Sequence, residues 1–114
     1  MRERDIERIL VDEVRRLGGR AYKWTSPGNA GVPDRIVILP GQAPVFAELK
    51  AEGGSLTKLQ KVQIRKLEEL RQDVCVIKGL EGLIDFFESR GYLDTASRIR
   101  TRHQEMEEGV DDGV

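Results

Sequence analysis

Two acidic residues at the ends of apolar segments constrain the fold of this chain more than any other feature. Asp34 precedes the apolar segment 36–39, and Glu48 lies near the end of the segment 45–50, which Lys50 closes. Asp and Glu are depleted in β-strands, so such charges are costly unless they bind something. The sequence therefore predicts two neighbouring strands whose ends bring two carboxylates and an ammonium group together.

The connection between these two strands decides whether the charges meet. Residues 40–44 have the composition of a turn, Pro-Gly-Gln-Ala-Pro, so we expect the strands to pair antiparallel across a five-residue loop. This register places Ile36 opposite Glu48 and Asp34 opposite Lys50. Directly opposed residues share a sheet face, whereas a loop one residue shorter would turn Asp34 to the other face. The site therefore demands an odd loop or a bulge.

The rest of the chain supplies the elements around this hairpin. Apolar residues recur at helical spacing in three segments, and shorter strand candidates precede the hairpin and follow the second helix. The element order is helix, three strands, helix, strand, helix, an α/β arrangement in one domain. The predicted helices are 2–17, 57–71 and 80–89, and the further strands are 21–24 and 73–78.

The C-terminal residues differ from this domain, which we place at residues 1–90. Residues 91–104 form an extension with a weak helical pattern, and we expect the acidic tail, residues 105–114, to be disordered. This tail holds five acidic and no basic residues, while the whole chain has a net charge of −1. The remaining domain is therefore mildly basic, which permits a nucleic-acid partner without indicating one.

Composition excludes several other classes of protein. One Cys75 rules out an internal disulfide, and with a single His103 it argues against zinc sites and histidine-centred catalysis. No apolar segment approaches the roughly 20 residues that cross a bilayer, and no secretory signal opens the chain. We therefore expect a cytoplasmic protein with no membrane partner.

Two polar residues on the predicted helices are candidates for the same site. Glu7 lies at the edge of the apolar face of the first helix; periodicity favours a solvent-facing carboxylate over one aimed at the strand ends. Gln60 follows Thr57 by three residues, so it either completes a capping box or points its amide toward the sheet. The pattern leaves both alternatives open for Gln60.

The strand-end residues have the chemistry of a magnesium site. Mg²⁺ takes hard oxygen ligands and keeps several waters, and Asp34, Glu48 and the backbone carbonyl of Leu49 can supply such oxygens. Lys50 could orient or deprotonate the attacking water, or neutralise a phosphate. The second role is easier to defend, because nearby carboxylates favour the charged form of a lysine. This set fits metal-assisted phosphodiester hydrolysis.

Three short motifs together resemble the VRR-Nuc family of the PD-(D/E)xK nuclease superfamily. They are Gly31-Val32-Pro33-Asp34, Glu48-Leu49-Lys50 and Leu56-Thr57-x-x-Gln60, and the likeness extends from the first helix through Phe87. The resemblance implies a restriction-endonuclease-like mixed sheet flanked by helices in the order αβββαβα. It also implies Asp34, Glu48 and Lys50 as the catalytic core, Gln60 as a fourth site residue, and Glu7 as the helical glutamate of the metal shell.

The resemblance also implies an activity. Members of this family are Mg²⁺- or Mn²⁺-dependent DNA endonucleases without an organic cofactor. The stand-alone members from phages or bacteria act as homodimers on branched DNA such as four-way (Holliday) junctions, in the bacterial or host cytoplasm. Lys23, Ser26 and Lys58 are our candidates for DNA contacts; Ser26 lies in a loop whose small residues suit a phosphate, although its composition alone favours an ordinary connection.

Three other interpretations remain open from the sequence. The substrate could be a flap, a nicked duplex or RNA. The chain could be a non-catalytic nucleic-acid-binding module, but the intact set of Asp34, Glu48 and Lys50 argues against a decayed site. Asp34 and Lys50 could instead form a structural ion pair, which would leave Glu48 and Glu7 unexplained.

Overall fold

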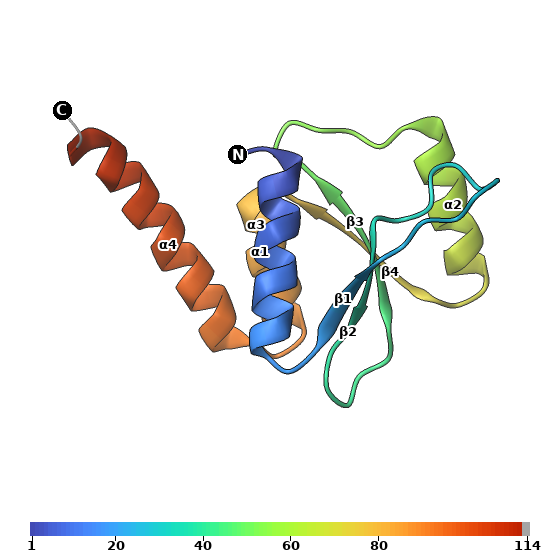
Figure 1. Cartoon of the computed structure of the whole chain (residues 1–114), viewed down its shortest axis with the longest axis horizontal. Coiled ribbons are helices and arrows are strands. Elements are labelled where there is room, and N and C mark those ends of the chain that lie inside the picture. The colour runs from blue at the N-terminus through green and yellow to red at the C-terminus, as the bar shows by residue number, and fades with distance from the viewer. Residues whose placement is uncertain (113–114) are drawn as a thin grey trace.

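The computed structural model describes the backbone of residues 1–112 and the side chains of residues 1–102. Its elements follow the predicted order, with a fourth helix added at the end (Figure 1). The elements are α1 (Glu3–Arg16), β1 (Arg20–Lys23), β2 (Arg35–Ile38), β3 (Val45–Lys50), α2 (Lys58–Glu69), β4 (Asp73–Lys78), α3 (Gly79–Ser89) and α4 (Leu93–Asp112). The αβββαβα arrangement predicted from the sequence is confirmed.

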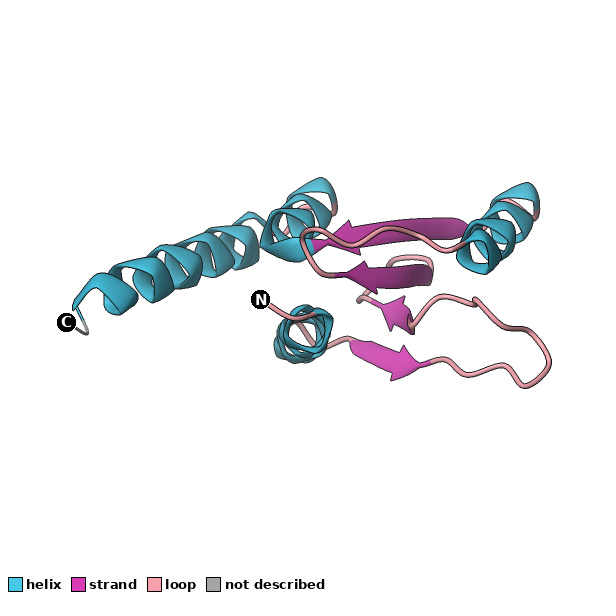
Figure 2. Cartoon of the chain, turned by 90° about the horizontal axis from the view of Figure 1, so that it is seen from above, coloured by secondary structure: helices cyan, strands magenta, loops and turns pink. Residues whose placement is uncertain are grey.

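The four strands form one mixed sheet in the order β1-β2-β3-β4. β1, β2 and β3 pair antiparallel, whereas β3 and β4 pair parallel. A parallel pair needs a crossover connection, and α2 supplies it. Helices α1 and α3 lie on one side of the sheet and α2 lies on the other, as both views show (Figures 1 and 2).

Strand β3 separates the hydrophobic core from the polar site. Val45, Ala47 and Leu49 are fully buried on the side of α1 and α3. Because side chains alternate along a strand, Glu48 and Lys50 project to the opposite side, where α2 lies. The core is completed by apolar residues from α1, α3, β2 and β4, among them Ile6, Leu10, Val14, Val37, Ile77, Leu83, Ile84 and Phe87.

The register of the β2–β3 hairpin differs from our prediction by two residues. Ile36 pairs with Phe46 instead of Glu48, and Val37 pairs with Val45. The reason is a tight turn that begins at Leu39: Gln42 N donates to Leu39 O at 3.2 Å, and Gly41 has a φ of 70°, as in a type II turn. The ladder resumes only at Val45, so seven residues connect the paired positions. A shift of two residues preserves the sheet faces.

Helix α4 extends further than the weak pattern indicated. We expected a helical stretch within 91–104 and disorder from residue 105, and the structure has one helix from Leu93 to Asp112; residues 113 and 114 lie outside the described part. Ala96 and Ile99 are buried in the core, and Arg98 donates to the fully buried carboxylate of Glu13 on α1. Over the described residues, no helix has the length and apolar character that crossing a membrane requires.

Candidate active site

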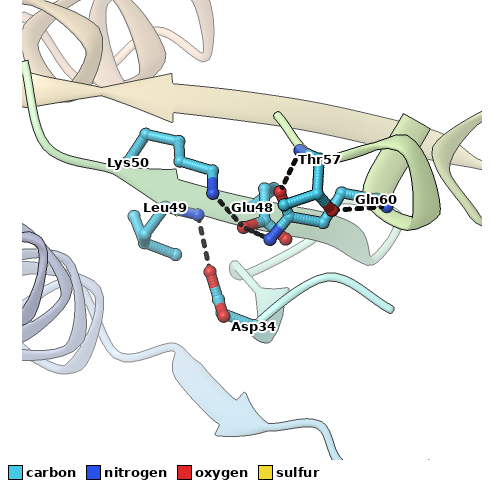
Figure 3. Close-up of polar contacts among 6 residues, drawn as sticks. All are labelled: Asp34, Glu48, Leu49, Lys50, Thr57 and Gln60. Carbon is cyan, nitrogen blue, oxygen red and sulfur yellow. Dashed lines mark hydrogen bonds and ion pairs between the residues drawn. The ribbon is translucent and has the colours of Figure 1, made fainter. Parts of the chain in front are cut away.

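Asp34 lies where strands β2 and β3 separate. The β2–β3 ladder ends at the pair of Arg35 and Ala47, while β3 continues to Lys50 beside β4 alone. The Asp34 side chain occupies the next position, where its Oδ2 accepts a hydrogen bond from the Leu49 backbone N–H at 2.8 Å (Figure 3). Continuing the register places Asp34 opposite Glu48. The hairpin therefore brings Asp34 next to Glu48, although not opposite Lys50 as we predicted.

Glu48 is the buried centre of the site. Its residue is 1% exposed, and its Oε2 lies 3.9 Å from Lys50 Nζ and accepts a hydrogen bond from Gln60 Nε2 at 3.2 Å. Among the described residues its Oε1 has no hydrogen-bond partner. Burial, with a further contribution from Asp34, raises the pKa of Glu48 to about 8, and Lys50 opposes this rise. A buried carboxylate oxygen without a partner needs a ligand or a proton.

Gln60 satisfies both interpretations that the sequence left open. Its backbone N–H donates to Thr57 Oγ1 at 3.2 Å, and its Oε1 accepts from Thr57 N at 2.9 Å, which is a complete capping box. The Nε2 atom of the same amide donates to Glu48 (Figure 3). One side chain therefore caps α2 and fixes the orientation of the Glu48 carboxylate, so the position of α2 is linked to the site.

The carboxylate that α1 contributes is that of Glu3 rather than Glu7. Oxygens of Glu3, Asp34 and Glu48 all lie within 4.8 Å of one another. Glu7 instead accepts a hydrogen bond from Arg35 Nε at 2.7 Å, and within the described residues it is not part of this cluster. Sequence reasoning missed Glu3 because it precedes the first buried residue, Ile6. The available signal was the i, i+4 spacing, which puts Glu3 on the line of Glu7.

These residues fit a divalent cation on structural grounds. Three carboxylates converge on one point, and Glu48 Oε1 is buried without a partner among the described residues. The N–H and C=O of one strand residue point to the same neighbouring strand, so the Leu49 carbonyl lies on the side of Asp34. Mg²⁺ and Mn²⁺ both take such oxygen ligands. The site is therefore of the type that holds a hard divalent metal.

The three candidate DNA contacts occupy different positions. Lys58 is exposed in the first turn of α2, which also carries Gln60. Ser26 lies in the loop between β1 and β2, where its Oγ accepts from Asn29 Nδ2 at 3.0 Å. Lys23 is exposed and pairs with Arg35, so it projects from the α1 side of the sheet. Lys58 is closest in the chain to a site residue, and Lys23 lies on the sheet face opposite to Glu48.

Gly31 sets the distance between the β1–β2 loop and α2. It has a φ of 91°, and a Cβ atom there would lie 2.6 Å from the Leu59 backbone carbon. Such a distance is too short for any side chain. The loop that carries Ser26 can therefore pack directly on the first turn of α2 only because residue 31 is glycine.

Comparison with known proteins identifies the family. No protein-family model matches the sequence. The chain is 47% identical over 77 residues to "Putative nuclease p44" of Acyrthosiphon pisum secondary endosymbiont phage 1. The matched segment covers 68% of this chain and 83% of the phage protein. A solved VRR_NUC domain superposes with a TM-score of 0.66 at 24% identity, over 79% of this chain and 97% of that domain. The fold and the phage relative together show that this chain belongs to the VRR-Nuc family of nuclease domains.

Proposed function

We propose that this protein is a metal-dependent DNA endonuclease that hydrolyses phosphodiester bonds. The observation that carries the proposal is the convergence of Glu3, Asp34 and Glu48 within 4.8 Å, with Lys50 beside the buried Glu48. Membership of a nuclease family supports the general activity. The metal and the branched substrate are our own assignment.

The proposed metal ligands are the carboxylates of Glu3, Asp34 and Glu48 and the carbonyl of Leu49. A bound Mg²⁺ or Mn²⁺ would act as a Lewis acid toward the phosphoryl oxygen and would lower the pKa of a coordinated water. Asp34 is held for this role by its hydrogen bond to Leu49 N. Glu48 Oε1, which has no hydrogen-bond partner within the described part of the chain, is the oxygen that we expect to coordinate the metal.

Lys50 and Gln60 are the proposed catalytic residues beyond the ligands. Lys50 has a side chain that is 12% exposed and lies 3.9 Å from Glu48 Oε2. A cation held in this partly desolvated position can stabilise the charge that develops on the phosphate oxygens, or orient the attacking water. Gln60 holds Glu48 Oε2 by a hydrogen bond, which fixes the orientation of the carboxylate that we assign to the metal.

We further propose that the substrate is branched DNA, such as a four-way junction, and that the protein acts as a homodimer. Two symmetric incisions in a junction require two sites, which a two-fold symmetric dimer supplies. Lys58 and Ser26, on the α2 side, are the proposed phosphate contacts near the site, and Lys23 is a contact with a more distant part of the duplex. The phage origin of the relative supports action in the cytoplasm of a bacterial cell.

A cleavage assay tests this function. Labelled four-way junction, flap, nicked duplex, linear duplex and single-stranded DNA, and an RNA duplex, are incubated with Mg²⁺, Mn²⁺ or EDTA. We expect metal-dependent cleavage, strongest on the junction, that is lost in Asp34→Ala and Lys50→Ala. The matched control is Lys66→Ala, which changes an exposed lysine in the last turn of α2. This variant should retain full activity.

The outcomes separate the general activity from its details. Equal cleavage by wild type and both site variants, or no cleavage with either metal, would overturn the nuclease proposal. Preferred cleavage of flaps, nicked duplex or RNA would overturn only the substrate. A monomer in light scattering under assay conditions, with junction cleavage intact, would overturn only the dimer.

A further inference from the structure

We propose that Glu7 and Arg35 form a positioning pair for the metal centre: their ion pair holds α1 against β2 so that Glu3 lies beside Asp34 and Glu48. The inference rests on the proposed function, because it assigns the pair a role toward the metal. Neither residue is expected to touch the metal or the substrate. Arg35 had no role in the site predicted from the sequence, and Glu7 had a different one.

The contacts of Arg35 connect three elements. Its Nε donates to Glu7 Oε2 of α1 at 2.7 Å, and its Nη1 donates to the backbone oxygen of Ala21 in β1 at 3.1 Å. The side chains of Arg35 and Glu7 are only 20% and 22% exposed. Charge-assisted hydrogen bonds in such partly shielded places are stronger than exposed ion pairs, which contribute little. One guanidinium therefore ties β2 to both α1 and β1.

The positions of these residues in the chain link the pair to the cluster. Glu3 precedes Glu7 by one helical turn, about 6 Å along the axis, and both lie on the same side of α1. Asp34 directly precedes Arg35 in the sequence. The same two segments thus meet twice, once at Glu7 and Arg35 and once at Glu3 and Asp34. Because Glu3 lies one helical turn from Glu7, the first contact limits where the second can form.

Glu3 needs such support because of its place and its charge. It lies in the first turn of α1 and is exposed, and helix ends fray. The buried residues that anchor α1, beginning with Ile6, follow it in the chain. Carboxylates within 4.8 Å of one another also repel each other. An attractive contact one turn away opposes this repulsion before a cation binds.

A metal titration without nucleic acid tests the pair. Mn²⁺ is titrated by calorimetry into wild type, Glu7→Gln, Arg35→Met and Glu3→Gln, and into Glu3→Gln combined with each of the other two. Loss of a residue that orients a ligand typically weakens metal binding 10- to 100-fold, so we expect at least about tenfold weaker binding in Glu7→Gln and in Arg35→Met. In the Glu3→Gln background neither change should weaken binding further, because the pair acts through Glu3.

Two control variants separate positioning from general loss of stability. Arg98→Met breaks the ion pair between Arg98 of α4 and Glu13 of α1, the helix that also carries Glu7. Arg100→Met breaks the exposed pair with Glu88. Both should keep the wild-type affinity for Mn²⁺ at a temperature at which circular dichroism shows all variants folded. Arg98→Met is expected to lower the melting temperature at least as much as Arg35→Met.

Several results would overturn the inference. One is unchanged Mn²⁺ affinity in Glu7→Gln and Arg35→Met; another is weakening by Glu7→Gln that persists in the Glu3→Gln background, which would make Glu7 a ligand itself. With wild-type cleavage intact, either result leaves the proposed nuclease function standing. If the wild type binds Mn²⁺ as predicted but cleaves no nucleic acid, the proposed function is overturned and the role of the pair stands. If the wild type does not bind Mn²⁺, the proposed function and the role of the pair are both overturned.

Discussion

Asp34 Oδ2 accepts a hydrogen bond from the backbone N–H of fully buried Leu49 at 2.8 Å. A side chain therefore completes the β2–β3 ladder at the position where the backbone pairing of β2 ends. This contact explains why an acidic residue stands at the start of a strand. It satisfies a buried donor and holds the carboxylate beside Glu48 at the same time. Structure and site therefore depend on the same residue.

Asp34→Ala and Asp34→Asn should separate these two roles. Alanine leaves the Leu49 N–H without its acceptor, which costs about 1–3 kcal/mol of the free energy of unfolding. Part of that cost is offset, because the change also removes the repulsion of Glu48. Asparagine keeps an acceptor oxygen and should be the more stable variant, yet both should lose Mn²⁺ binding and cleavage. Urea denaturation in EDTA and a metal titration measure the two effects; wild-type metal affinity in Asp34→Asn would contradict the assignment.

The pKa of Glu48, raised from 4.5 to about 8, predicts how stability changes with pH without metal. Between these two values the folded state binds a proton that the unfolded state has lost, so the free energy of unfolding should fall as pH rises from 4.5 through 8. We expect the protein in EDTA to be less stable at pH 8 than at pH 5.5, and Mg²⁺ to restore stability mainly at the higher pH. Chemical denaturation measures this.

The matched variant for this pH effect is Glu48→Gln, which has no proton to lose. Its stability should depend less on pH over the same range and should not respond to Mg²⁺. The control is Glu88→Gln, which changes an exposed glutamate of α3 and should retain the wild-type pH dependence. A wild type that becomes steadily more stable from pH 5.5 to pH 8 in EDTA would contradict the raised pKa.

Thr57→Ala and Gln60→Ala should distinguish capping from the role of the amide in the site. Thr57→Ala removes the side-chain cap of α2 and is expected to cost about 1 kcal/mol of stability, with metal affinity retained. Gln60→Ala removes the side-chain oxygen that accepts from Thr57 N and also the hydrogen bond to Glu48 Oε2, so it should additionally weaken metal binding and cleavage. Thermal denaturation and metal titration on both variants check this; equal metal affinity in the two would show that Gln60 is only a cap.

Gly31→Ala should disturb the contact between the β1–β2 loop and α2. Alanine at a φ of 91° is strained by about 1–2 kcal/mol, and its Cβ would also overlap the Leu59 backbone. Gly28→Ala is the control, since Gly28 has a similar φ of 83° but no described atom within 4 Å of the added Cβ. We expect Gly31→Ala to lower both stability and cleavage more than Gly28→Ala. Similar melting temperatures in the two variants would refute the packing argument.

The sequence by itself determined the elements and selected most residues of the candidate site. Hydrophobic periodicity gave the helices and strands within a few residues, because burial of an apolar face follows the local repeat of the backbone. It also selected Asp34, Glu48 and Lys50, because charges at strand ends stand out against an apolar pattern. Even the requirement for an odd hairpin loop followed from the alternation of side chains.

Only the tertiary structure decided which residues from distant segments join this site. The turn at Leu39 shifted the register by two residues, since a tight turn at one end of a loop does not determine where pairing resumes. The position of Glu3, rather than Glu7, beside Asp34 and Glu48 depends on the tilt and rotation of α1, a helix that the Arg35–Glu7 ion pair ties to β2. Periodicity locates a residue on the face of its own helix, but distances between elements come from packing and long-range ion pairs, which no local pattern encodes.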